Sequence, residues 1–155
     1  MRIADDQGHI LISEPLERPL ARIEPVTLPT EKQTLLVTVD YSVGFGSYAG
    51  PTTFLLELDG PRFQWAQATN EGTKSIVKIA LARTLKSDWK LSPSESGQDV
   101  LSFYCRPADA GGSGDFELHY VRYHFDAEKG WLRYERVKKG LWESEEAFPP
   151  RKAFP

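Results

Sequence analysis

The chain contains few of the residues from which metal and redox sites are usually built. Among its 155 residues are one cysteine and three histidines. A single cysteine excludes a disulfide within the chain. His119 and His124 are five positions apart in an alternating stretch, so their side chains point to opposite faces of one strand and cannot bind one metal ion together. We therefore expect no metal site and no cofactor.

The cysteine itself lies in an apolar strand pattern. Cys105 follows Phe103 by two positions and Leu101 by four, which places the three side chains on one face of a strand. No base or helix N-terminus in the neighbouring sequence would activate its thiol. We expect Cys105 to be a small buried apolar residue without a catalytic role.

Long apolar runs and a basic excess are also missing. No apolar run approaches the ~20 residues that a membrane helix requires, and the first residues lack the pattern of a signal peptide. The 19 basic residues are outnumbered by 22 acidic ones, whereas dedicated nucleic-acid binders usually carry a basic excess. We expect a cytoplasmic protein that binds neither membranes nor nucleic acid.

Catalytic motifs are incomplete wherever they occur. The glycine-rich segment 44–50 resembles a phosphate-binding loop, but Pro51 and a strand-like run follow it in place of a helix N-terminus. Ser75 and Lys78 have the S-x-x-K spacing without its companion motifs. The sequence predicts a surface loop at 44–50 and no catalytic residues.

The composition that is present is that of one globular domain with two unusual ends. Hydrophobic residues make up 40% and charged residues 26% of the chain. Residues 1–31 carry prolines at positions 15, 19, 25 and 29, which exclude a helix, so we expect an extended arm without regular structure. Residues 32–142 would form a β-rich domain, and residues 143–155 an acidic, proline-rich tail.

Alternating patterns predict most of the strands. Residues 34–43 and 100–106 read as strands. Residues 52–68 read as a hairpin that turns at Asp59-Gly60, and residues 116–137 as a long hairpin with Gly130 in its loop. In the long hairpin, Glu117, His119, Val121 and Tyr123 would share one face, with Phe116, Leu118 and Tyr120 on the other.

Residues 73–88 fit two patterns. Val77, Ile79 and Leu81 alternate as in a strand, but the length, the alanine and lysine content and Thr73 as an N-cap favour a helix. We therefore predict an α+β fold of mostly antiparallel sheet, with about six or seven strands and one helix near 73–88. An all-β sandwich or barrel is the alternative.

The apolar residues between prolines suggest a function in binding. We expect a non-catalytic protein-binding or assembly module, an accessory, decoration or immunity-type subunit, whose ends dock on a protein partner or on a second copy of the chain. The alternative for the two ends is docking on the surface of the chain's own domain. The residues that would dock are Leu16, Leu20, Ile23, Phe148 and Phe154. The alternative is a small-ligand-binding sheet with a cavity lined by Trp65, Trp131 and Tyr134.

Overall fold

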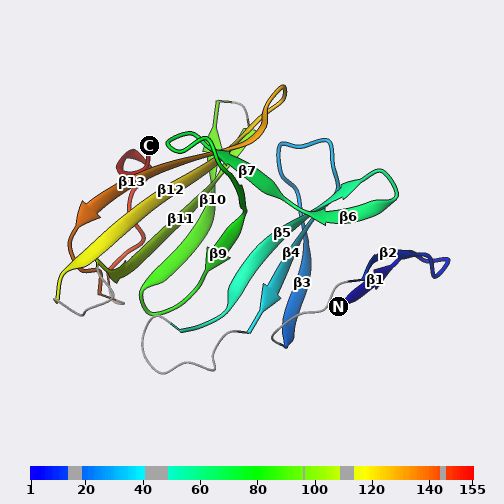
Figure 1. Cartoon of the computed structure of the whole chain (residues 1–155), viewed down its shortest axis with the longest axis horizontal. Coiled ribbons are helices and arrows are strands. Elements are labelled where there is room, and N and C mark those ends of the chain that lie inside the picture. Colours follow the sequence, from blue (N-terminus) through cyan, green and yellow to red (C-terminus); the bar gives the residue numbers. More distant parts are fainter. Residues whose placement is uncertain (14–18, 41–48, 96, 109–113, 144–145) are drawn as a thin grey trace.

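The computed structural model describes residues 1–13, 19–40, 49–95, 97–108, 114–143 and 146–155, without the side chains of residues 20 and 21. These residues form three β-sheets and, within the described ranges, no α-helix (Figure 1). The strands are β1 (Arg2–Ala4), β2 (Ile10–Ser13), β3 (Leu20–Val26), β4 (Thr34–Val39), β5 (Thr52–Asp59), β6 (Arg62–Trp65), β7 (Gln67–Asn70), β8 (Ile76–Lys78), β9 (Ala80–Ala82), β10 (Ser87–Ser94), β11 (Gly97–Pro107), β12 (Phe116–Asp126) and β13 (Gly130–Lys139). A short 3-10 helix, η1 (Arg151–Ala153), lies near the C-terminus.

The two large sheets exchange strands at one place. One sheet has the order β10-β11-β12-β13-β7-β8, and the other has the order β3-β4-β5-β6 with β9 also paired to β5. The chain passes from one sheet to the other at Ala66, between β6 and β7, and returns at Ile79, between β8 and β9. The N–H of Ala66 donates to Leu55 (2.8 Å) and the N–H of Ile79 donates to Ala66 (3.0 Å), so both crossing points keep their backbone hydrogen bonds.

The main core lies between these two sheets. Buried apolar side chains of both sheets pack against one another there: Leu28, Leu36, Leu55, Ala66, Ala68, Ile79, Leu81, Val100, Val121, Tyr123 and Trp131. We call the side of the six-stranded sheet that faces this core its inner face. This layered arrangement within the described residues is that of a sandwich, not of one closed sheet.

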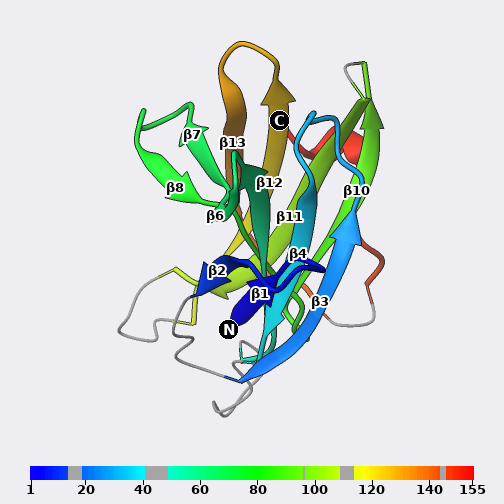
Figure 2. The same cartoon turned by 90° about the vertical axis from the view of Figure 1, so that its right-hand side faces the viewer.

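Each large sheet is also covered on its outer side by an end of the chain. The β1–β2 hairpin packs Ile12 and its neighbours on Val37, Val39 and Leu56 of the five-stranded sheet, in front of which it lies in Figure 2. On the outer face of the six-stranded sheet, Trp142 and Phe154 pack with Leu101, Phe103, Cys105 and Tyr120. Both ends of the chain are therefore part of the packed structure.

The predicted helix over residues 73–88 is wrong, and with it the α+β class. The segment forms β8, β9 and the start of β10. Ile79 and Leu81 are almost fully buried while Lys78 and Ala80 are exposed, which is the two-residue period of a strand. Burial between two sheets overrides the weak helix propensity of the alanines and lysines. The all-β alternative agrees with the structure.

The N-terminal segment was expected to be irregular, and this is wrong for three parts of it. Residues 2–4 and 10–13 form the β1–β2 hairpin. Residues 20–26 are regular as well. They form β3, which pairs with β4 in antiparallel fashion and includes Pro25 opposite Leu35. A proline is tolerated here because β3 is the outermost strand of its sheet and needs hydrogen bonds on one side only.

The other strand predictions are largely confirmed. Residues 34–39 form β4, whereas 41–43 and most of the loop predicted at 44–50 lie outside the described residues. The hairpins β5–β6 and β12–β13 form where expected, and Gly60 and Gly130 both have positive φ, at 58° and 74°. The strand predicted at 100–106 lies within β11.

Candidate functional site

The β12–β13 hairpin carries polar side chains on both faces of the six-stranded sheet. As its alternation predicts, His119, Val121 and Tyr123 point to the inner face, with Val121 and Tyr123 in the core between the sheets. Tyr120 belongs to the outer cluster together with Trp142 and Phe154. His119 and His124 therefore lie in separate polar clusters, one on each face.

The outer cluster is centred on a buried carboxylate. The Asp99 side chain has no exposed surface and lies on β11. One carboxylate oxygen is 2.9 Å from Nδ1 of His124, and the other accepts a hydrogen bond of 2.8 Å from Nη2 of Arg151. Nη1 of Arg122 lies 3.7 Å from the same oxygen, within ion-pair distance. A buried carboxylate is destabilising unless charged and hydrogen-bonded groups surround it, so Asp99 requires these partners.

Three separate parts of the chain bring these groups together. Asp99 lies at the start of β11, while Arg122 and His124 lie on β12, the neighbouring strand. Arg151 comes from η1 in the C-terminal segment, 52 residues beyond Asp99. That segment is also held by the hydrogen bond from Nε of Arg122 to the main-chain oxygen of Pro155. The cluster therefore exists only when the C-terminal segment is docked.

A pocket of about 690 Å³ opens beside Asp99. We call it the arginine pocket; its lining residues are Ser94, Glu95, Asp99, Arg122, His124, Tyr134, Arg151 and Pro155. The guanidinium group of Arg122 lies 4.4 Å above the ring of Tyr134, an attractive cation–π arrangement that fixes its plane. The side chain of Arg151 is 41% exposed and that of Arg122 is 19% exposed, so both guanidinium groups reach the pocket surface.

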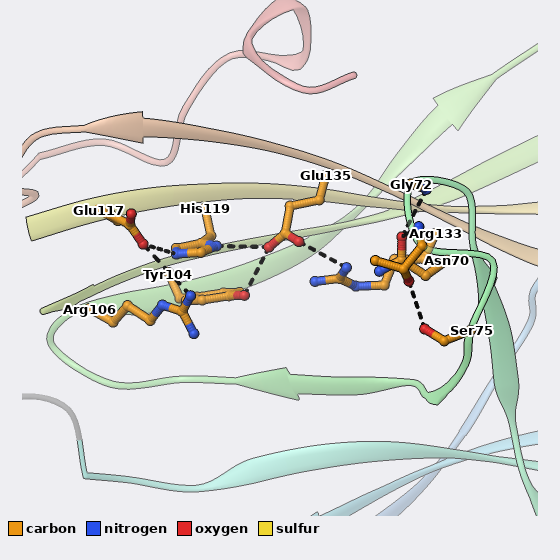
Figure 3. Close-up of polar contacts among 10 residues, drawn as sticks. Asn70, Gly72, Ser75, Tyr104, Arg106, Glu117, His119, Arg133 and Glu135 are labelled. Atoms are coloured by element: carbon orange, nitrogen blue, oxygen red, sulfur yellow. Dashed lines mark hydrogen bonds and ion pairs between the residues drawn. The ribbon is translucent and has the colours of Figure 1, made fainter. Parts of the chain in front are cut away.

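The inner cluster is built around Glu135 (Figure 3). One oxygen of Glu135 accepts hydrogen bonds from Tyr104 (3.1 Å) and lies 2.8 Å from Nδ1 of His119, whose ring stacks on Tyr104. The other oxygen accepts from Nη1 of Arg133 at 3.0 Å. Nε2 of His119 lies 3.3 Å from Glu117, which is an ion-pair distance but lacks the geometry of a hydrogen bond.

These contacts shift the pKa values of the inner cluster. Burial by itself raises the pKa of Glu135, but hydrogen bonds from Arg133, His119 and Tyr104 and the charge of Arg133 outweigh it and lower the pKa to about 2. Burial and the neighbouring Glu135 carboxylate raise the pKa of the Tyr104 hydroxyl. Glu135 therefore carries its charge among groups that hydrogen-bond to it, which is a structural arrangement more than a binding one.

The three aromatic residues expected to share one cavity lie in three different places. Trp131 is buried in the core between the sheets, where Nε1 donates a hydrogen bond of 2.6 Å to Glu57. Trp65 packs edge-on against Phe54 and under the ammonium group of Lys78. Tyr134 lines the arginine pocket, whereas Trp131 lines a separate pocket of about 460 Å³ beside Glu57 and Phe125.

Of the five residues expected to dock on a partner, Phe148 and Phe154 pack within the chain. Phe154 is 3% exposed and stacks with Phe148 over the outer face of the six-stranded sheet. Ile23 on β3 is 37% exposed. Leu20 begins β3, but its side chain and all of Leu16 lie outside the described residues.

Sequence reasoning missed the residues that make the arginine pocket, namely Asp99, Arg122 and Arg151. One signal was available for Asp99. It precedes Leu101, Phe103 and Cys105 by two, four and six positions, so alternation places a carboxylate on an apolar strand face. A charge at such a position requires partners, but no local pattern identifies an arginine 52 residues away.

Other kinds of site find no support in the described ranges. Cys105 is buried with a free thiol. In the part of the chain that the structure describes, no three His, Cys, Asp or Glu side chains lie close enough together to hold a metal ion. No helix among the described residues has the length and hydropathy to cross a membrane. Comparison of the chain with protein-family models, curated proteins and solved structures finds no match.

Proposed function

We propose that the chain is a small-ligand-binding β-sheet domain whose ligand is an organic anion, with a carboxylate or phosphate group, bound in the arginine pocket. The observation that carries this proposal is the pair of guanidinium groups at the surface of the pocket. Two guanidinium groups, Arg122 and Arg151, border it beside the single buried carboxylate of Asp99. Glu95 also lines the pocket, but it lies at the exposed β10–β11 turn.

The hydrogen bonds of the pocket leave donors for a ligand. Arg122 donates through Nε to Pro155, while its Nη1 stands 3.7 Å from Asp99, beyond hydrogen-bond distance. Arg151 uses Nη2 for Asp99. A guanidinium group has five N–H donors in a fixed plane, and this geometry matches the paired oxygens of carboxylates and phosphates.

The pocket also has the size and the rigidity of a ligand site. Its volume of about 690 Å³ falls in the range of ~300–1,000 Å³ that is common for small-molecule sites. Asp99 fixes Arg151 and His124, and Tyr134 fixes the plane of Arg122, so the donors are in place before a ligand arrives.

The proposal is tested by thermal unfolding with a panel of anions, such as inorganic phosphate, citrate and a phosphorylated sugar, and with glycerol as the uncharged control. An anion at about ten times its Kd should add about 1.4 kcal/mol of stability, or roughly 3–6 °C in Tm for a domain of this size. Arg122→Gln should abolish this shift, each variant being compared with its own unliganded Tm.

The matched control is Arg106→Gln. Arg106 belongs to the same sheet but pairs with Glu117 at the inner cluster. Its variant should keep the full anion-induced shift. An equal shift in Arg122→Gln, or no shift with any anion in the native protein, would contradict the proposal.

A further inference from the structure

The second half of β13 is an open edge of the six-stranded sheet. β13 pairs with β12 along its whole length, but it pairs with β7 only at Trp131, Leu132 and Arg133. From residue 134 to 139, no strand of the described ranges pairs with its other side. Figure 1 shows this end of β13 at the border of the sheet, away from β7.

Backbone groups of alternate residues point outward along this edge. The carbonyl of Arg133 accepts a hydrogen bond of 2.9 Å from the N–H of Glu71, next to β7, so Arg133 faces away from β12. Since successive residues of a strand point their backbone groups to opposite sides, those of Glu135, Val137 and Lys139 also face outward. Such a row of donors and acceptors is a template for another strand.

The inner cluster holds this edge in place. Glu135 is anchored to His119 on β12, to Tyr104 on β11 and to Arg133 on its own strand (Figure 3). The edge is therefore ordered before any strand is added, which lowers the entropic cost of pairing.

The side chains of the edge select the kind of strand that fits. Arg136, Lys138 and Lys139 are basic and exposed, and Val137 is 45% exposed. The one acidic residue, Glu135, is already paired within the inner cluster. A second copy of the chain paired along the same edge would bring these basic side chains near one another, which is unfavourable.

We propose that residues 134–139 of β13 are a docking edge for an extended acidic segment of a partner protein, which pairs with β13 as an additional strand. Main-chain hydrogen bonds to the outward-facing backbone groups supply affinity, and carboxylates opposite Arg136 and Lys138, which share the outer face of the sheet, supply selectivity. The edge shares only Tyr134 with the arginine pocket, whose other lining residues lie around Asp99.

An NMR titration with a capped peptide of alternating glutamate and valine tests the proposal. We expect the largest amide shifts at Glu135, Val137 and Lys139, with smaller ones at the inward-facing amides of Tyr134 and Arg136. A peptide of alternating lysine and valine should not bind. Saturable shifts that occur elsewhere, or no shifts at millimolar peptide, would overturn the proposal.

Variants of one outward-facing residue make the test specific. Val137→Pro removes the outward N–H of residue 137, which no strand of the described ranges uses. Because proline is tolerated at such sheet edges, the fold should persist. The affinity for the peptide should fall about tenfold. Val137→Thr keeps the N–H and should bind like the native chain. In Val137→Pro, an affinity for the peptide equal to that of the native chain would count against strand pairing. If that variant fails to fold, the amide shifts of the native chain show whether the peptide binds at this edge.

Two further measurements distinguish peptide binding at this edge from binding in the arginine pocket and from pairing with a second copy of the chain. Arg122→Gln should leave peptide affinity unchanged, because that residue lies in the arginine pocket. Loss of peptide binding in this variant would move the site to the pocket. Sedimentation should show a monomer without peptide, whereas self-association that Val137→Pro abolishes would show that a second copy occupies the edge.

Discussion

At the scale of single residues, Glu135 is a carboxylate whose pKa its neighbours lower strongly. Its charged form is stabilised by Arg133, His119 and Tyr104, which lower its pKa from 4.5 to about 2 despite partial burial. A carboxyl group whose pKa is lower in the folded state stabilises the fold above its unfolded pKa, and this contribution disappears as the pH falls through the folded pKa. The contribution of Glu135 should therefore be complete above pH 4.5 and lost near pH 2.

Glu135→Gln should remove this pH dependence. We expect the variant to lose about 1–2 kcal/mol at pH 7, a value reduced from the full shift because the side chain is partly exposed to solvent, and almost nothing at pH 2. Urea unfolding at a series of pH values measures the difference. A difference that stays constant from pH 7 to pH 2 would show that Glu135 acts through packing and not through its charge.

The sequence predicts the strand position of Glu135 but not its contacts. The sequence places His119 and Glu135 on the inner faces of β12 and β13, but nothing in the spacing indicates that they meet across the two strands. Asp99 is the opposite case, because its position on an apolar strand face signals a buried charge while its partner Arg151 lies far along the chain.

At the scale of elements, turn chemistry was the most informative part of the sequence. Gly60 has a φ of 58° in the two-residue connection between Asp59 and Arg62, and a Cβ atom there would meet no other group within 4 Å. Glycine at the first of two turn positions suits a type II′ hairpin, and Pro61 at the second fits its fixed negative φ.

Gly60→Val should destabilise the protein by about 1 kcal/mol or more, because a β-branched residue resists positive φ. Since nothing crowds the position, the whole effect comes from the backbone. Gly60→Asn is the matched control and should cost less, because asparagine tolerates the left-handed region. Thermal unfolding of the two variants makes the comparison, and equal Tm values would argue against this turn.

Elements without turn signals were predicted less well. The segment from Thr73 to Ser87 forms strands because Ile79 and Leu81 fill the core between the sheets, and local propensity carries no information on that environment. Similarly, Pro25 excludes a helix but not an edge strand, so β3 could be recognised only from its neighbour β4.

At the scale of the whole molecule, both ends of the chain complete cores on the outer sides of the sheets. Phe154 packs edge-on against Tyr120, with ring centroids 5.7 Å apart, and stacks with Phe148. Arg136 donates a hydrogen bond of 3.0 Å to the carbonyl of Ala153. The C-terminal segment is thus held by apolar packing and by hydrogen bonds to the sheet.

Phe154→Ala should therefore destabilise the whole domain. We expect a loss of about 3 kcal/mol, the usual effect of removing a buried phenylalanine, and a Tm lower by roughly 6–12 °C. Lys152→Ala, two residues earlier and exposed, is the control and should leave the Tm unchanged within about 1 °C. An unchanged Tm in Phe154→Ala would show that the segment does not contribute to the core.

We propose that the docked C-terminal segment completes a pocket for an organic anion beside Asp99. NMR titration with citrate and with inorganic phosphate, following backbone amides and the Nε–H signals of the arginines, tests it most directly. We expect saturable shifts concentrated at Arg122, His124, Tyr134 and Arg151, absent in Arg122→Gln and retained in Arg106→Gln. Shifts that do not saturate, that follow the exposed lysines, or that persist in Arg122→Gln would contradict it.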